Sequence, residues 1–236
     1  MFHSVPHLER PDLDILPAEV SDFDERQRVF AVVESVRERD ILTFEHSRRV
    51  AIYAQRLARA LGMNRVDAEQ YALAGQIHDA GKSWIADTIL KKTGELTAEE
   101  FDTIRAHVLI GERLMSAYDL PELFLHAARH HHEAFDGSGY PDGLRGEDIP
   151  YVARVLAIVD AVDVMTSVRP YKEASQIAEA LAEIEREAGR QFDPEIARAF
   201  IQLTHGEASF IVPARLCVVQ RDPAKAGAWY QIATRF

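Results

Sequence analysis

Apolar side chains recur three or four residues apart along most of the 236-residue chain, the spacing that places them on one face of an α-helix. In the segment FEHSRRVAIYAQRLARALG, Val50, Tyr53 and Leu57 share such a face, and Gly62 is a natural helix end. The same reasoning predicts seven helices, over residues 44–61, 65–80, 97–115, 121–132, 150 onward, 174–188 and 194–204. Thr97 and Glu100 are expected to form a capping box at the start of the third, and Asp193 to cap the last. The pattern therefore predicts an all-α fold.

Both ends of the chain depart from this pattern. Residues 1–25 carry three prolines and no helical period, which predicts an irregular arm. In residues 206–236, ARLCVVQ and AWYQIAT flank the turn-rich RDPAKAG, which suggests a small β-hairpin. The helical domain is accordingly expected over residues 26–205.

The composition narrows the class of protein. Hydrophobic residues make up 47% of the chain and charged residues 28%, as in ordinary globular proteins. The single cysteine, Cys217, cannot form an internal disulfide, no apolar run reaches the ~18 residues of a membrane span, and the first residues do not resemble a secretory signal. The net charge of −11 argues against a nucleic-acid polymer as partner but leaves a small phosphorylated ligand open. We expect a cytoplasmic protein with no membrane contact.

Polar side chains interrupt the predicted apolar faces. Asp160 follows Val152 and Leu156 at helical spacing, and a carboxylate in a core position is costly unless it is paired or binds a metal. Five of the ten histidines and two aspartates face inward or end helices in this way: His46, His78, Asp79, His107, His131, His132 and Asp160. Imidazoles combined with carboxylates suit Fe, Mn, Zn or Ni rather than Ca or Mg.

Each of these residues, taken alone, also has a structural interpretation. An inward His46 or His107 is commonly a hydrogen-bonded core histidine, and Asp160 alone is commonly a polar contact between helices. The pair His131–His132 would suit the dipole at a helix C-terminus. The functional interpretation rests on the joint occurrence of these residues and on their order along the chain.

That order resembles the HD-GYP subgroup of the HD-domain metal-dependent phosphohydrolases. The motifs are His46, HDAGK at 78–82, His107, HHEAFDGSGYPDGL at 131–144, ARVLAIVDAVDVMTSVRPYK at 153–172 and GRQFDPEIARAF at 189–200. They cover residues 40–204. The resemblance implies a helical HD-domain bundle with a non-haem metal centre, in a family that includes phosphodiesterases of the bacterial second messenger cyclic di-GMP.

By this resemblance, the seven residues that interrupt the apolar faces are metal ligands, and Asp79 bridges two ions. Family members with a third ion have a glutamate four residues before the first histidine, where this chain has Leu42. Glu45 faces another direction on the helix, so two ions are expected, iron or manganese first and zinc or nickel as alternatives. Two such ions bind the oxygens of a phosphodiester and lower the pKa of a bridging water, whose hydroxide attacks in line.

The resemblance also implies contacts with a cyclic dinucleotide substrate. Lys82 would contact the scissile phosphate and offset charge in the transition state, while Arg169 and Lys172 of RPYK would hold the other phosphate. Taken alone, these three residues would be read as solvated surface charges.

The loop after the two adjacent histidines would form the rim of the site. Glycines at positions 137, 139 and 143 allow backbone conformations closed to other residues, and Tyr140 would lie on this rim and help to select substrate. Asp163, one turn beyond Asp160, would support the site by orienting a ligand or Lys82.

The expected function is a metal-dependent phosphodiesterase that hydrolyses cyclic di-GMP to pGpG, GMP or both. One alternative is a phosphohydrolase acting on another cyclic dinucleotide or nucleotide, and another is a non-catalytic module that binds cyclic di-GMP or a partner protein. The complete set of ligands with Lys82 favours catalysis. No nucleobase-reading residue can be identified, and a homodimer or a signalling partner stays open.

Overall fold

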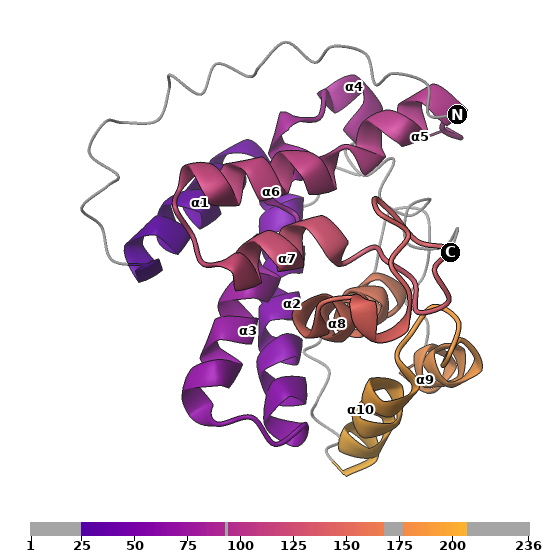
Figure 1. Ribbon diagram of the computed structural model, residues 1–236. Coiled ribbons are helices and arrows are strands. Elements are labelled where there is room, and N and C mark those ends of the chain that lie inside the picture. The colour runs from indigo at the N-terminus through magenta and orange to yellow at the C-terminus, as the bar shows by residue number, and fades with distance from the viewer. Residues whose placement is uncertain (1–24, 93, 168–176, 207–236) are drawn as a thin grey trace.

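Helices account for the regular structure of the part of the chain that the structure describes. The computed structural model describes residues 25–92, 94–167 and 177–206, and within these ranges there is no strand. The α-helices are α1 (Glu25–Arg39), α2 (Ile41–Ala60), α3 (Arg65–Ile77), α4 (Asp87–Leu90), α5 (Ala98–Arg105), α6 (His107–Ala117), α7 (Glu122–His130), α8 (Tyr151–Thr166), α9 (Ile177–Arg186) and α10 (Pro194–Gly206), with 3-10 turns η3 (Ala80–Trp84) and η4 (Gly146–Asp148). Figure 1 shows their arrangement. The all-α prediction is confirmed; residues 1–24 of the arm and the predicted hairpin lie outside the described residues.

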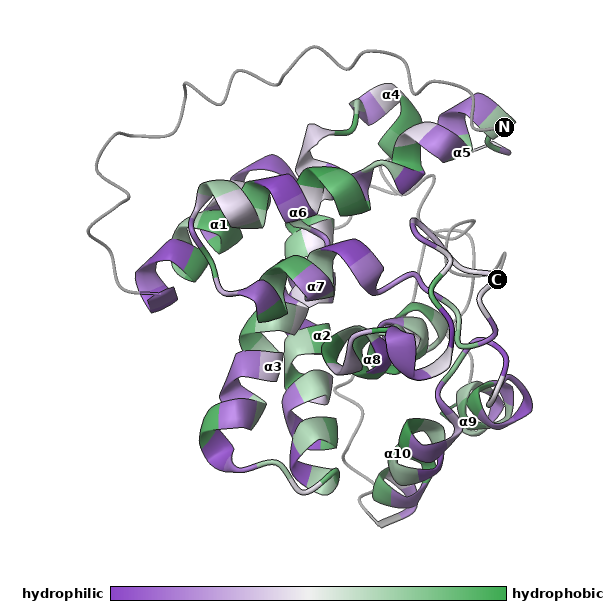
Figure 2. Ribbon diagram, in the orientation of Figure 1, coloured by the Kyte–Doolittle hydropathy of each residue, from purple (hydrophilic) through white to green (hydrophobic). Residues whose placement is uncertain are grey.

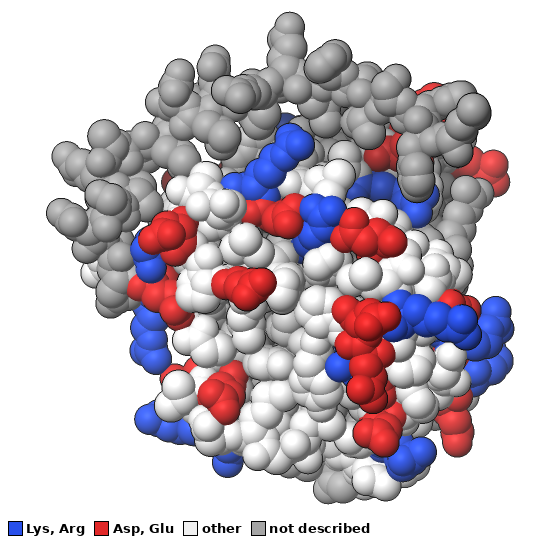
Figure 3. Space-filling model, viewed as in Figure 1, with Lys and Arg blue, Asp and Glu red and all other residues white. Residues whose placement is uncertain are grey.

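The main core lies among α1, α2, α3, α6, α7, α8 and α10, and Figure 2 shows apolar residues on the inner sides of the bundle. Among its fully buried side chains are Leu57, Ile77, Phe124 and Leu156. Within the described ranges, no helix is long and apolar enough to cross a membrane. On the face drawn in Figure 3, acidic and basic side chains lie side by side.

Several predicted helix ends are present as expected. Thr97 and Glu100 form the reciprocal capping box of α5, and the Asp193 carboxylate accepts from the backbone N–H of Glu195 at the start of α10. Gly62 follows α2 with a φ of +88°, a conformation that favours glycine.

Helix α1 was not predicted. Val29, Val32, Val33 and Val36 are buried at the spacing of one helical face, although valine has a low intrinsic helix propensity. Packing of this valine stripe against the core therefore decides the conformation, and propensity alone does not.

The predicted helix over residues 97–115 is two helices, because the hydrogen-bond pattern is interrupted at Ala106. Helices α4 and α5 close over a small second apolar cluster that includes Leu90 and Ile104. Figure 1 shows α4 and α5 on one side of the bundle. Ile110 of α6, the helix that begins at His107, also packs against this satellite cluster.

The segment HDAGK also differs from its predicted helical ending. Helix α3 ends at Ile77, so His78 and Asp79 lie in the connection to η3, which contains Lys82. A Cβ at Gly81 would lie 2.0 Å from the His107 carbonyl oxygen, so only glycine allows η3 to approach the α6 backbone so closely. This approach brings Asp79 next to His107.

Candidate metal centre

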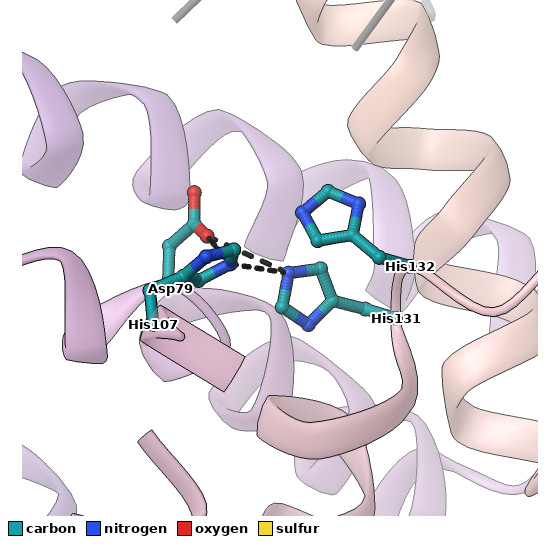
Figure 4. Close-up of side chains that lie close together, drawn as sticks. All are labelled: Asp79, His107, His131 and His132. Atoms are coloured by element: carbon teal, nitrogen blue, oxygen red, sulfur yellow. Dashed lines mark hydrogen bonds and ion pairs between the residues drawn. The ribbon is translucent and has the colours of Figure 1, made fainter. Parts of the chain in front are cut away.

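The seven predicted metal ligands converge from helices α2, α6 and α8 and from the segments that follow α3 and α7. Asp79, His107, His131 and His132 each offer a ligand atom within 4.8 Å of the others, and His46, His78 and Asp79 form a second such group. The first group is shown in Figure 4. Asp160 lies beside the second group without being one of its members, with its Oδ1 3.0 Å from His46 Nε2. Asp79 belongs to both groups and lies between them.

Backbone carbonyls orient three of the histidines. The pairs are His78 Nδ1 with Gly75 O (2.8 Å), His107 Nδ1 with Ile104 O (2.6 Å) and His131 Nδ1 with Ala127 O (2.9 Å). A carbonyl oxygen only accepts, so each Nδ1 carries the proton and each Nε2 presents its lone pair. This tautomer is the one in which Nε2 binds a metal.

The protonation states of the buried histidines agree with this arrangement. Burial lowers the pKa of His78 and of His107 to about 4, and burial also lowers the pKa of His132 well below its ordinary value. These imidazoles are therefore neutral at pH 7, and a metal binds the neutral form.

His46 is oriented by side chains instead of a carbonyl. Its Nδ1 lies 2.7 Å from Asp163 Oδ2, and Arg49 donates to both Asp163 oxygens at 2.6 and 2.9 Å. Burial by itself raises the pKa of Asp163, but the hydrogen bond from His46 and the ion pair with Arg49 outweigh it and lower that pKa to about 2. Arg49 was not predicted, and its only signal in the sequence is its place one turn after His46.

Lys82 contacts the aspartate that the two groups share. Its Nζ lies 2.5 Å from Asp79 Oδ2, and the lysine is only 4% exposed. Burial by itself raises the pKa of Asp79, but Lys82 and the nearby histidines hold it well below its usual range. Asp79 is therefore an ionised carboxylate in the interior.

Several ligand atoms form no hydrogen bond within the described part of the protein, although Asp79 Oδ1 lies 3.3 Å from His107 Nε2 and 3.5 Å from His131 Nε2. His78 Nε2, Asp79 Oδ1 and His132 Nε2 are buried and form no hydrogen bond with the described residues. Buried polar atoms without a partner are rare, because each costs ~1–3 kcal/mol. A donor set of imidazoles and carboxylates suits transition metals, so the residues present fit a metal centre.

Tyr140 lies deeper than the expected rim position. Its side chain is 3% exposed, and its ring stacks on the His132 ring with centroids 5.0 Å apart and planes at 22°. The guanidinium carbon of Arg105 lies 4.3 Å from the centroid of the Tyr140 ring. Arg105 was not among the predicted site residues.

The loop that carries Tyr140 is held by a buried carboxylate. Glu133 accepts hydrogen bonds from the backbone N–H of Asp142 (2.8 Å) and of Leu144 (3.1 Å). Gly137 and Gly143 have positive φ values of +85° and +65°, as expected. The glycine at position 139 is needed for a different reason, since a Cβ there would lie 2.2 Å from the backbone nitrogen of Ala134.

The remaining predicted residues do not join either group of ligand atoms. Arg169 and Lys172 lie outside the described residues. Leu42 is 37% exposed in the first turn of α2, and Glu45 belongs to neither group. Asp163 contacts His46 and Arg49. It was predicted to orient either a ligand or Lys82, and in the described structure it contacts His46, a ligand candidate, whereas Lys82 contacts Asp79.

Comparison with known proteins identifies the family. The HD-domain family model matches residues 32–196. The chain belongs to the HD-domain family. This match confirms the family resemblance, and the expected phosphodiesterase relatives are found as well.

The chain is 42% identical over 167 residues to a cyclic di-GMP phosphodiesterase of Thermotoga maritima, covering 70% of this chain and 45% of that protein. It is 34% identical over 179 residues to the 3'3'-cGAMP-specific phosphodiesterase 2 of Vibrio cholerae, covering 75% and 34%. This chain thus spans less than half the length of each of these two relatives. The fold is similar to Bd1817, a HDG"Y"P protein from Bdellovibrio bacteriovorus, with a TM-score of 0.58 and 18% identity over 70% of this chain and 53% of that one.

Proposed function

We propose that the chain is a phosphodiesterase that hydrolyses cyclic di-GMP to pGpG, GMP or both, using two transition-metal ions. The observation that carries this proposal is the pair of buried ligand groups that share Asp79, with Lys82 bound to the same carboxylate. The HD-domain membership and the cyclic di-GMP phosphodiesterase relative support it.

The two ions would be held by different sets of residues. Asp79, His107, His131 and His132 would hold one ion, and His46, His78, Asp79 and Asp160 the other. Leu42 offers no ligand atom where a third ion would need one, so we propose two, iron or manganese. When bound, the ions would supply polarisation of the phosphodiester and a lower pKa for the attacking water.

The side chains of the chain itself contribute charge and orientation. Lys82 holds an ammonium in a buried region, where a charge has a stronger effect than in water, and it would offset negative charge that accumulates on the phosphoryl oxygens. Its bond to Asp79 fixes the ammonium before substrate binds. Arg169 and Lys172 would hold the second phosphate, Arg169 through paired hydrogen bonds and Lys172 as a point charge.

A second candidate substrate has direct support. The Vibrio cholerae relative is named as specific for 3'3'-cGAMP. The same hydrolytic site would then act on a mixed cyclic dinucleotide.

Turnover measurements test the proposal. Chelator-treated protein, reloaded with Mn²⁺ or Fe²⁺, is incubated with cyclic di-GMP, 3'3'-cGAMP, cyclic di-AMP and pGpG, and the products are separated by chromatography. Metal-dependent loss of cyclic di-GMP is expected. Cleavage of 3'3'-cGAMP alone would overturn the substrate and keep the mechanism, whereas tight binding without turnover would make the chain a sensor.

A further inference from the structure

A stack of three side chains extends outward from the candidate metal centre. His132 contributes Nε2 to the first ligand group, Tyr140 stacks on the His132 ring, and Arg105 lies over the Tyr140 ring. The Tyr140 backbone N–H also donates to the His132 carbonyl oxygen at 3.1 Å, so the two residues are tied at backbone and side chain.

The interruption at Ala106 explains how Arg105 reaches this stack. Residues two positions apart on a continuous helix point in nearly opposite directions. Arg105 ends α5 and His107 begins α6, yet both serve the same site, His107 as a ligand candidate and Arg105 through Tyr140. The sequence pattern of one unbroken helix would have directed Arg105 away from His107.

The chemistry of the stack suits a fixed ring orientation. A planar guanidinium is attracted to the negative face of an aromatic ring and stacks on it, whereas a lysine ammonium is attracted to the ring but cannot stack on it. The rings of His107 and His131 donate hydrogen bonds to backbone carbonyls, and no such bond is recorded for the His132 ring within the described residues. The recorded neighbours of the His132 ring are other rings. The orientation of the His132 imidazole therefore depends on the rings that pack on it.

We propose that Arg105 is a positioning residue that, through Tyr140, holds the His132 imidazole in the orientation that binds metal. The inference rests on the proposed metal centre. Residues that orient a metal-ligating imidazole commonly contribute ~10–100-fold in metal affinity. Arg105 acts one residue further out, so its removal should weaken the affinity of the site by about three- to tenfold.

The first measurement needs no metal. Imidazole resonances of metal-free protein are recorded by NMR, with the His132 signals assigned from His132→Gln. Arg105→Met should shift the His132 signals, while Arg113→Met, the same change at an exposed position on α6, should leave them in place. Unchanged His132 signals in Arg105→Met would overturn the proposal even if the protein binds metal normally.

The second measurement is the Mn²⁺ dissociation constant of the same variants. Arg105→Met and Tyr140→Leu should each weaken binding, and the double variant should be no weaker than Tyr140→Leu, because Arg105 acts through that ring. Arg105→Lys should fall between wild type and Arg105→Met. Additive losses, or an Arg105→Met affinity equal to that of Arg113→Met, would overturn the assignment.

Failure of the proposed function gives a different pattern from failure of this inference. If wild-type protein binds no Mn²⁺, the metal centre falls, and with it the positioning role. If wild type binds two ions and cleaves substrate but the Arg105 variants bind Mn²⁺ normally, only the positioning role falls. Thermal unfolding of the metal-free variants identifies any that have simply lost their fold, and Arg105→Lys then serves in place of Arg105→Met.

Discussion

The two halves of the candidate metal centre differ in what orients their ligands. On one side, His107 and His131 donate to carbonyls of the preceding helical turn, three and four residues away. On the other side, His46 on α2 is oriented by Asp163 on α8, 117 residues away, and Asp163 is in turn paired with Arg49. His107 and His131 therefore depend on local backbone, as His78 does in the other half, whereas His46 depends on two helices packing together.

This difference means that the halves should fail in different ways. A backbone carbonyl cannot be removed by substitution, so the His107 half is sensitive mainly to its ligands and to the loop around it. The His46 half has a side-chain support that a single substitution can delete. The following variants test this contrast, beginning with the residue that the two halves share.

Asp79→Ala should impair both halves together, because both groups lose the residue that they share. We expect loss of most bound metal and all activity, with helical circular dichroism largely retained, as measured by elemental analysis of protein purified without chelator. Asp87→Ala, at an exposed aspartate that pairs with Lys91, is the matched control. Full retention of one ion in Asp79→Ala would show that the halves do not share this residue, and three ions in wild type would contradict the two-ion proposal.

Lys82→Ala should separate chemistry from metal binding in both halves. The lysine contacts Asp79 but is not a ligand candidate, so metal content should stay unchanged while kcat falls ~10²–10³-fold, the effect of losing one preorganised charge. Steady-state kinetics and metal analysis on the same sample give the result. Lys91→Ala on the surface should change neither quantity, and a fall in metal content that matches the fall in kcat would contradict the assignment.

Arg49→Met should weaken the His46 half alone. Asp163 would stay buried without its cation, and removing one partner of a buried ion pair typically costs ~3–5 kcal/mol of the free energy of unfolding. The affinity for one of two ions should fall ~10–100-fold, as for other partners that orient a ligand, while the second ion stays bound. Arg48→Met, its exposed neighbour, is the control in denaturant unfolding and metal titration. Equal weakening of both ions would remove the contrast between the halves.

Glu133→Gln should give the smallest effect, confined to the loop beside the His107 half. An amide in place of the carboxylate turns a donor towards a backbone N–H, which costs ~1–3 kcal/mol locally. Hydrogen exchange at the amides of Asp142 and Leu144 should become faster, and KM should rise a few-fold with both ions bound. Asp136→Asn, at a carboxylate that caps Ser138 in the same loop, is the comparison; equal exchange in the two variants would show that Glu133 does not hold the loop.

The sequence indicates the candidate ligands better than the residues that orient them. His46, His107 and Asp160 could be predicted because each occupies a core-facing position that an apolar residue would otherwise fill. Arg49 could not be separated from the other arginines of α2, because burial of a cation depends on a carboxylate that lies far along the chain.

The helix boundaries show the same limit. The capping box at Thr97 is local chemistry and was predicted, whereas the interruption at Ala106 involves neither glycine nor proline and left no signal. Helix α1 did leave a signal in the spacing of its valines, but a run of β-branched residues also suits a strand. Tertiary packing decides the conformation in such cases, and the sequence of one short segment does not contain that information.

Gly81 is needed for the geometry of the site, although it has no reactive side chain. Since a methyl group there would meet the His107 carbonyl oxygen at 2.0 Å, every other residue type would push η3, and the motif it carries, away from α6. A saturation mutagenesis screen scored by turnover would consequently rank position 81 among the reactive residues, although it has no side chain to bind or react. Such a screen therefore reports positions where two backbone segments must lie close together as well as positions that take part in catalysis.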